Sequence, residues 1–214
     1  MNRSKKNIFV SVSLILLAII YTVLVKTIDL GNIGPEGSIV GFSKLNNYFK
    51  NFVGVHMKLY KITQLLGIII ILVAFVYAII GLMQLVKRKN ILKIDREILL
   101  LGCFYIVVIG LYVFFEKFII NYRPILMDGL EASYPSSHTV LALCVSFSAI
   151  MVNNSLFKSI KNIKYINVIL VVLAVTITLG RLFSGVHWLT DIIGGVLFSI
   201  ALLKTFKTVV EYNK

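Results

Sequence analysis

The residues best suited to chemistry lie at the edges of apolar runs, in three groups: Lys117 and Arg123; Pro135-Ser136-Ser137-His138; and Arg181, His187 and Asp191. His187 and Asp191 are four positions apart, which places both side chains on one face of a helix. The carboxylate can then hold the imidazole, fix its tautomer and raise the basicity of the other nitrogen, so that His187 could act as a nucleophile. A structural hydrogen bond would show the same spacing, and His138, His187 and Asp191 could alternatively ligate a metal ion.

Three cationic side chains, Lys117, Arg123 and Arg181, favour a bound anion over a metal ion, because they would repel a cation from the same site. Arg suits bidentate contact with phosphate oxygens, and Lys adds a point charge. Lys117 and Arg123 alone could be anchors that snorkel to a membrane surface. Together with Arg181, they indicate a phosphoryl group.

The second group, Ser136-Ser137-His138 after Pro135, opens an apolar run. Backbone N–H groups at a helix start and the serine hydroxyls can donate to phosphate oxygens, although an ordinary helix cap would look the same. The position places His138 at the same depth as His187. Two histidines at one depth fit the two roles of nucleophile and acid.

The elements that carry these residues are membrane spans. Apolar residues make up 58% of the 214 and charged residues only 14%, and the mean hydropathy is +0.93, which a soluble fold of this size could not hide. The apolar runs are continuous, which excludes a β-barrel. We predict an all-α, polytopic membrane protein with its active site at the outer membrane edge. It forms a single domain, residues 1–214, with six spans near 8–28, 62–86, 98–118, 137–157, 165–183 and 187–206.

The formal charge of +13 would suggest nucleic acid in a soluble protein, but the basic residues lie mostly in short segments between apolar runs. Anionic lipid headgroups are therefore the expected partner, nucleic acid is not, and no protein partner can be inferred. Lys and Arg are enriched in cytoplasmic loops, so both termini and the basic loops 87–96 and 158–164 are predicted to face the cytoplasm. The connections that carry the three polar groups then face outward.

The first outer loop has a helical pattern of its own, in which Phe42, Leu45, Phe49, Phe52 and Val53 recur at helical spacing. Such a segment could be an interfacial helix that lies on the bilayer. It could equally be a helix packed against the top of the bundle.

These motifs resemble those of the type 2 phosphatidic acid phosphatase superfamily of integral membrane phosphatases. Lys117 with Arg123-Pro124 looks like the first motif of that family, and Pro135-Ser136-Ser137-His138 looks like the second. The third and most specific motif is matched by Arg181, His187 and Asp191, with five residues between the first two and three between the last two. The motif order and the six spans also agree, so the resemblance covers essentially the whole chain.

Two features depart from the pattern of the family. The first motif usually has six residues between Lys and Arg-Pro, whereas Lys117 and Arg123 have five between them and Glu116 occupies the expected position. One residue turns a helix by about 100°, so Lys117 would need its long side chain or a local bulge to reach the site. Ser137 stands where Gly is commoner, which a negative φ would allow while the backbone N–H is kept.

The resemblance implies a lipid phosphatase that needs no metal and no cofactor. In it His187 attacks phosphorus and becomes a phosphohistidine, Asp191 orients it, and His138 protonates the leaving oxygen. Phosphate would be held by Lys117, Arg123, Ser136, Ser137 and Arg181. The candidate substrates are phosphatidate, phosphatidylglycerol phosphate and undecaprenyl diphosphate, with a slight preference for the last by family analogy. The alternatives are a non-catalytic phospholipid binder or transporter, and a lipid phosphotransferase.

Overall fold

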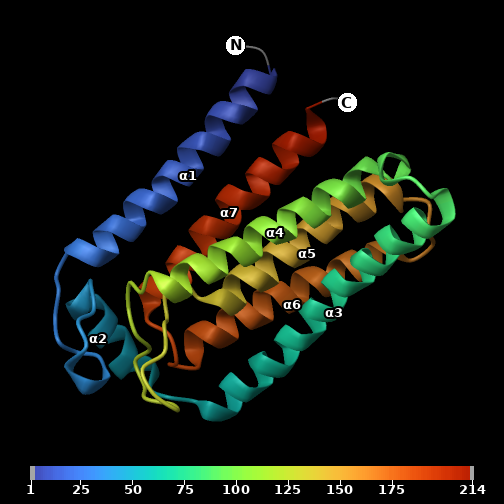
Figure 1. Cartoon of the computed structure of the whole chain (residues 1–214). Helices are drawn as coiled ribbons and strands as arrows, with labels where there is room; N and C mark the ends of the chain where they lie inside the picture. The colour runs from blue at the N-terminus through green and yellow to red at the C-terminus, as the bar shows by residue number, and fades with distance from the viewer. Residues whose placement is uncertain (1–2, 213–214) are drawn as a thin grey trace.

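The computed structural model describes residues 3–212, and in that range it is built from helices and loops (Figure 1). Two short 3-10 helices, η1 (Pro35–Gly37) and η2 (Ile91–Lys93), lie in connections. The α-helices are α1 (Arg3–Thr27), α2 (Ser43–Val53), α3 (Met57–Arg88), α4 (Arg96–Lys117), α5 (Ser137–Leu156), α6 (Ile163–Phe183) and α7 (Leu189–Glu211).

Six of these helices, all except α2, are long and apolar enough to cross a membrane. The predicted all-helical bundle of six spans is confirmed. The helices α1 and α3 extend beyond their apolar runs at the charged ends, and α7 begins two residues later than predicted, at Leu189. That late start matters for the site, because it leaves His187 outside the helix.

The central helix of the bundle is α5, which packs against α3, α4, α6 and α7 and is the most buried of the six spans. Apolar side chains of α1, α3, α4 and α6 are widely exposed on the surface, as expected of helices that face lipid. Inside, Leu101 and Phe104 of α4 pack with Cys144 of α5 and Phe206 of α7, and the rings of Phe104 and Phe206 are 4.8 Å apart.

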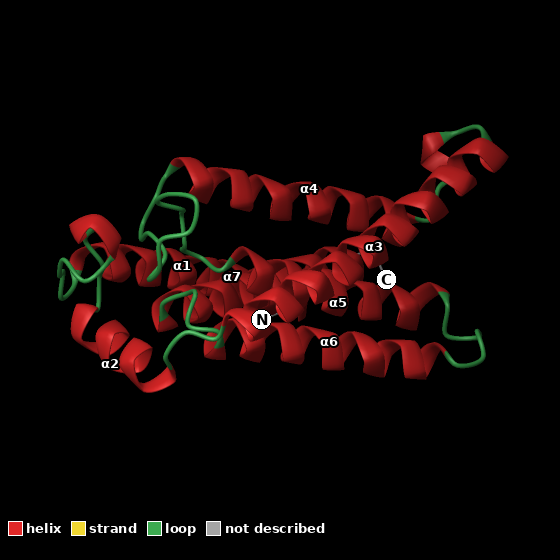
Figure 2. Ribbon diagram, turned by 90° about the horizontal axis from the view of Figure 1, so that it is seen from below, coloured by secondary structure: helices red, strands yellow, loops and turns green. Residues whose placement is uncertain are grey.

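The loops gather at the two ends of the bundle (Figure 2). The start of α1, the end of α7, the α3–α4 connection and the α5–α6 connection lie at one end (Figure 1). At the other end lie α2, the long connection from α4 to α5 and the short connection from α6 to α7. The basic connections are thus separated from the segments that carry the motif residues by the full length of the bundle.

The helical segment in the first loop is α2, and it packs through a polar side chain. Asn46 is completely buried, and its Nδ2 donates to Thr190 Oγ1 at 3.0 Å, at the start of α7. Leu45, Tyr48 and Phe52 are exposed on the other side. One face of α2 therefore packs on the bundle, as one of the two alternatives expected, while an aromatic and aliphatic face remains open. A location of this open face in the membrane interface stays a prediction.

Candidate active site

The long connection from α4 to α5 contains a hairpin and carries residues of the first two motifs. Tyr122 and Ala132 form an antiparallel bridge. On either side of it, Arg123 N donates to Glu131 O at 3.0 Å and Ser133 N donates to Asn121 O at 2.9 Å. These bonds fix Arg123 and Ser133 relative to each other, although the two are ten positions apart in the chain.

Two hydrogen bonds attach this hairpin to the third motif. Trp188 Nε1 donates to Tyr122 O at 2.7 Å, and Ser136 N donates to Asp191 O at 3.0 Å. Three segments far apart in sequence are thereby held together at one end of the bundle. The side chains that they carry can act on a single ligand.

The arrangement of His187 and Asp191 differs from the one that helical spacing predicts. Because α7 begins at Leu189, His187 precedes the helix while Asp191 lies in its first turn, where Oδ2 accepts from Trp188 N at 2.9 Å as a capping contact. His187 Nδ1 is 3.7 Å from Asp191 Oδ2, too far for a hydrogen bond. The predicted direct contact is thus replaced by an indirect one.

Ser133 supplies that indirect contact. Its Oγ lies 3.1 Å from His187 Nδ1 and donates to Asp191 Oδ2 at 2.5 Å. Asn121 Nδ2 donates to the other carboxylate oxygen, Oδ1, at 3.3 Å. All four side chains are buried.

The other imidazole nitrogen of His187, Nε2, is buried and has no hydrogen-bond partner within residues 3–212. Burial holds the pKa of His187 below its ordinary value, and the nearby Arg123 and Arg181 act in the same direction, while Asp191 opposes them. A neutral imidazole with an unpaired nitrogen is suited to nucleophilic attack.

The guanidinium groups of the buried Arg181 and the half-buried Arg123 both contain nitrogen atoms without a partner in the described chain. Arg181 is completely buried, and it stacks 4.7 Å over the ring of Tyr60 and contacts Gln64 Oε1 at 3.4 Å. Its Nε and Nη1 have no partner among the described residues, and neither does Arg123 Nη1. Arg123 also forms an ion pair with Glu131 at 2.9 Å. Buried donors of this kind require an acceptor, and phosphate oxygens would satisfy them.

His138 lies in the first turn of α5, next to Ser137 and after Ser136. Its Nδ1 is buried and unpaired in the part of the chain that the structure describes. His138 and His187 lie close enough to interact electrostatically with each other and with Arg123 and Arg181. The N–H groups of the first helical turn have no partner inside the helix, so Ser137 and His138 can also present backbone donors.

Gly67 of α3 makes room for the imidazole of His138. A Cβ atom at this position would lie 3.0 Å from His138 Cδ2 and 3.4 Å from Nε2, which is tighter than ordinary contact. The close approach of the α3 backbone therefore fixes one side of the ring.

Lys117 and Glu116 differ in where their side chains lie. Lys117 is exposed at the end of α4 and does not line the cavity described below, whereas Glu116 does. The cause is the phase of the helix, since one residue turns the side chain by about 100°. The structure brings all of the predicted site residues to one end of the bundle. Of these, Ser137, His138 and His187 line the cavity, whereas Lys117, Arg123, Ser136, Arg181 and Asp191 do not. A phosphate-binding role for Lys117 stays a prediction.

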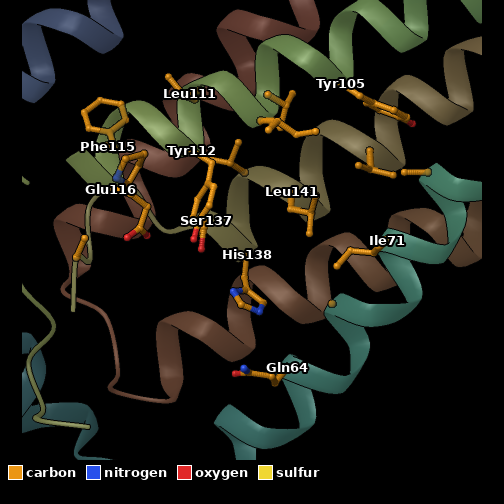
Figure 3. A pocket seen from close by; sticks show the side chains of 18 of the residues that line it. Gln64, Ile71, Tyr105, Leu111, Tyr112, Phe115, Glu116, Ser137, His138 and Leu141 are labelled. Carbon is orange, nitrogen blue, oxygen red and sulfur yellow. The ribbon is translucent and has the colours of Figure 1, made fainter. Parts of the chain in front are cut away.

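A cavity of about 760 Å³ begins at His138 and His187 and continues between α3, α4 and α5 (Figure 3). Near the histidines it is lined by polar groups such as Gln64, Glu116 and Ser137. Farther in, the lining is apolar and aromatic, and it reaches Ala78 of α3. Ala78 is fourteen positions after Gln64, which is a rise of about 21 Å along the helix. Such a cavity can hold a polar head and a long apolar tail.

The alternative of a metal site finds no support in the arrangement of ligands. Within residues 3–212, no three His, Cys, Asp or Glu side chains converge in the way that a metal ion requires. His138, His187 and Asp191 thus do not form a ligand set.

Sequence reasoning assigned no role to Ser133, Asn121, Gln64 or Tyr60. Gln64 interrupts an apolar run one helical turn after Tyr60, and that spacing was the available signal for a polar face pointing inward. Ser133 and Asn121 lie in a loop, where spacing predicts no shared face. Their part in the site could not be read from the sequence.

Comparison with known proteins agrees with this architecture. Residues 65–214 match the model of the PAP2 superfamily. "Phosphatidylglycerophosphatase B" of Bacillus subtilis (strain 168) is 34% identical over 88 residues, which are 40% of this chain and 41% of that protein. The crystal structure of a transmembrane PAP2 type phosphatidylglycerolphosphate phosphatase from Bacillus subtilis superposes with a TM-score of 0.65 at 21% identity. That match covers 95% of this chain and 97% of the other.

The family match includes the segments that carry Arg123, His138, Arg181, His187 and Asp191. The structural match extends the shared fold to nearly the whole bundle. As the resemblance of its motifs predicted, the chain belongs to the PAP2 superfamily.

Proposed function

We propose that this protein hydrolyses lipid phosphates without a metal ion, through a phosphohistidine on His187, and that residues 1–214 act as one phosphatase domain. One observation carries the proposal. His138 and His187 line the polar end of a cavity whose remainder is apolar, and each has a buried nitrogen atom without a partner in the described chain. The unpaired nitrogen atoms of Arg123 and Arg181 are buried close enough to interact electrostatically with both histidines. A phosphate on a lipid tail satisfies both parts.

In the first step, His187 Nε2 attacks phosphorus and the bond between phosphorus and the lipid oxygen breaks. His138 gives its proton to the leaving oxygen, so that the lipid departs as an alcohol. Arg123 and Arg181 neutralise the phosphoryl oxygens, while Ser136 and the start of α5, including the N–H of Ser137, add further donors.

In the second step, His138 takes a proton from water, which attacks the phosphorus of the phosphohistidine. The bond to His187 Nε2 breaks, and inorganic phosphate leaves. Both histidines return to their starting protonation states, so the cycle needs no other reactant. Asp191 holds its position in the first turn of α7 throughout.

The proposed substrate is a phosphomonoester of a lipid, with phosphatidylglycerol phosphate favoured over phosphatidate and undecaprenyl diphosphate. Both relatives named above are phosphatidylglycerol phosphate phosphatases by name. Glu116 adds a negative charge beside the phosphate end of the cavity, which disfavours a diphosphate more than a monoester. The open face of α2, with Tyr48 and Phe52, suits contact with lipid at the same end.

The proposed location is the cell membrane, with both termini in the cytoplasm and the site facing outward. The basis is the distribution of Lys and Arg, which are concentrated in the connections at the end opposite the site.

The test is phosphate release from a panel of lipid mono- and diphosphates by the purified protein in detergent, with EDTA present. His187→Ala is the matched variant. Release that survives EDTA and disappears in His187→Ala is expected, and so is a phosphoenzyme that is stable in alkali and labile in acid. Ranking the panel identifies the preferred headgroup.

Four results would contradict the proposal. Phosphate release at the wild-type rate by His187→Ala would exclude a phosphohistidine on this residue. Loss of phosphate release with EDTA would indicate that a metal ion is required. Binding of phosphatidylglycerol phosphate without release of phosphate would favour a binder or transporter. Transfer of labelled phosphoryl groups to an added alcohol instead of water would indicate a phosphotransferase.

A further inference from the structure

Ser133 stands between the carboxylate and the imidazole that the proposed mechanism requires. We infer that Ser133 is a positioning residue, whose hydroxyl fixes the tautomer of His187 and transmits the influence of Asp191 to it. This inference rests on the proposed function, because it concerns how the nucleophile is prepared. It adds a residue that lies outside the three motifs.

The distances define the route of the contact. His187 Nδ1 and Asp191 Oδ2 are 3.7 Å apart, while Ser133 Oγ is 3.1 Å from the first atom and 2.5 Å from the second. Ser133 is therefore the group that lies within hydrogen-bond distance of both. Without its hydroxyl, the two side chains would keep only a weaker interaction through space.

The direction of each hydrogen bond follows from counting protons. An ionised carboxylate only accepts, and a serine hydroxyl has one proton to donate. Asp191 Oδ2 accepts this hydrogen bond from Ser133, and the same oxygen also accepts one from Trp188 N at 2.9 Å. Ser133 Oγ can then only accept from His187, so the imidazole proton lies on Nδ1.

A proton on Nδ1 leaves the lone pair of Nε2 free, and Nε2 is the buried nitrogen without a partner in residues 3–212. The attacking atom is thereby selected. When Nε2 bonds to phosphorus, the ring becomes positively charged, and Ser133 with Asp191 behind it stabilises that charge. The stabilisation that Ser133 and Asp191 give to His187 therefore increases during the chemical step and not during substrate binding.

The hairpin holds Ser133 in place independently of the imidazole. Its backbone N–H donates to Asn121 O at 2.9 Å, and its side chain is almost fully buried. Asn121 also donates to Asp191 Oδ1 at 3.3 Å, so the same loop contacts both oxygens of the carboxylate. The hydroxyl is thus pre-organised, as the outer contacts of a catalytic group must be.

The test compares Ser133→Ala with wild type, with His187→Ala and with Ser146→Ala. Ser146 is a completely buried serine of α5 whose hydroxyl has no hydrogen-bond partner in the described chain, which makes it a matched control. We expect kcat of Ser133→Ala to fall about 10- to 100-fold, the usual effect of losing an orienting contact. KM should change little, and Ser146→Ala should keep its turnover.

Two further measurements distinguish a role of Ser133 in positioning His187 from a role in general structural support. The ¹⁵N NMR spectrum of the imidazoles, assigned with His187→Ala, should show the proton of His187 on Nδ1 in the wild type and a mixture of tautomers in Ser133→Ala. In addition, Ser133→Ala should lower kcat only slightly when Asp191 is already replaced by Ala, because the two residues act as one unit.

The outcomes are distinguishable. If His187→Ala abolishes turnover while Ser133→Ala keeps wild-type kcat and the Nδ1 tautomer, the inference about Ser133 is overturned and the proposed function stands. Additive losses in the double variant would also overturn it. If His187→Ala retains turnover, the proposed function itself fails.

Discussion

Trp188 Nε1 donates a 2.7 Å hydrogen bond to the main-chain oxygen of Tyr122, and this contact holds the hairpin against the connection between α6 and α7. The hairpin carries Arg123 and Ser133, whereas the connection carries His187. The Trp188 contact is one of several hydrogen bonds that link the segment proposed to bind phosphate to the segment that carries His187.

Trp188→Phe should remove this hydrogen bond and keep most of the packing. We expect the free energy of unfolding to fall by about 1 kcal/mol, the net value of one such bond. The loss in kcat/KM should exceed what that stability change explains, because Arg123 and Ser133 lose their fixed distance from His187. Thermal unfolding and lipid phosphatase assays on the same preparation measure both quantities. Unchanged kcat/KM with reduced stability would show that the contact only supports the fold.

Arg181 and Lys117 should contribute unequally, although both were predicted to bind phosphate. Arg181 is buried with unpaired nitrogen atoms, whereas Lys117 is exposed. We expect Arg181→Ala to lower kcat/KM about 100- to 1,000-fold, as for the loss of one transition-state donor. Lys117→Ala should cause a much smaller loss. Equal losses would mean that Lys117 reaches the phosphate when substrate is bound.

Gly67→Ala should displace the imidazole of His138 and so weaken its function as an acid, although His138 itself is not substituted. The new Cβ atom would lie 3.0 Å from His138 Cδ2, so the ring must shift by a few tenths of an ångström. Protonation of the leaving oxygen should suffer, and lipid alcohols, which are poor leaving groups, should be affected more than a nitrophenyl phosphate. Gly102→Ala is the matched control, because nothing lies within 4 Å of its Cβ position in α4. An equal loss for both leaving groups would argue against the role of His138.

The nucleophile should remain neutral in mildly acidic solution. Burial holds the pKa of His187 below its ordinary value of about 6.5, so the imidazole takes up a proton only at lower pH. Asp191 opposes this shift, and Asp191→Asn should therefore lower the pKa of His187 further. NMR titration of ¹⁵N-labelled histidine, assigned with His187→Ala, measures both. A pKa above the ordinary value in the wild type, or a rise in Asp191→Asn, would contradict this assignment of charges.

The sequence by itself determined the elements, and it pointed to most of the residues that the structure gathers in the candidate site. Continuous apolar runs define membrane spans, because the cost of burying polar backbone in lipid leaves few alternatives to a helix. The spacing of Arg181, His187 and Asp191, together with the order of the three motifs, was sufficient to identify the family. These signals are local, and local patterns can be read along the chain.

Only the tertiary structure decided how the side chains meet. Helical spacing predicted a direct contact between His187 and Asp191, but α7 begins at Leu189 and Ser133 completes the contact from a loop. Which of Glu116 and Lys117 lines the cavity depends on the phase of α4 relative to α3 and α5. The contacts of Ser133 and the packing of α4 are set by the path of the loops and by helix packing, and they join residues that are far apart in sequence. For that reason no pattern in the sequence encodes them.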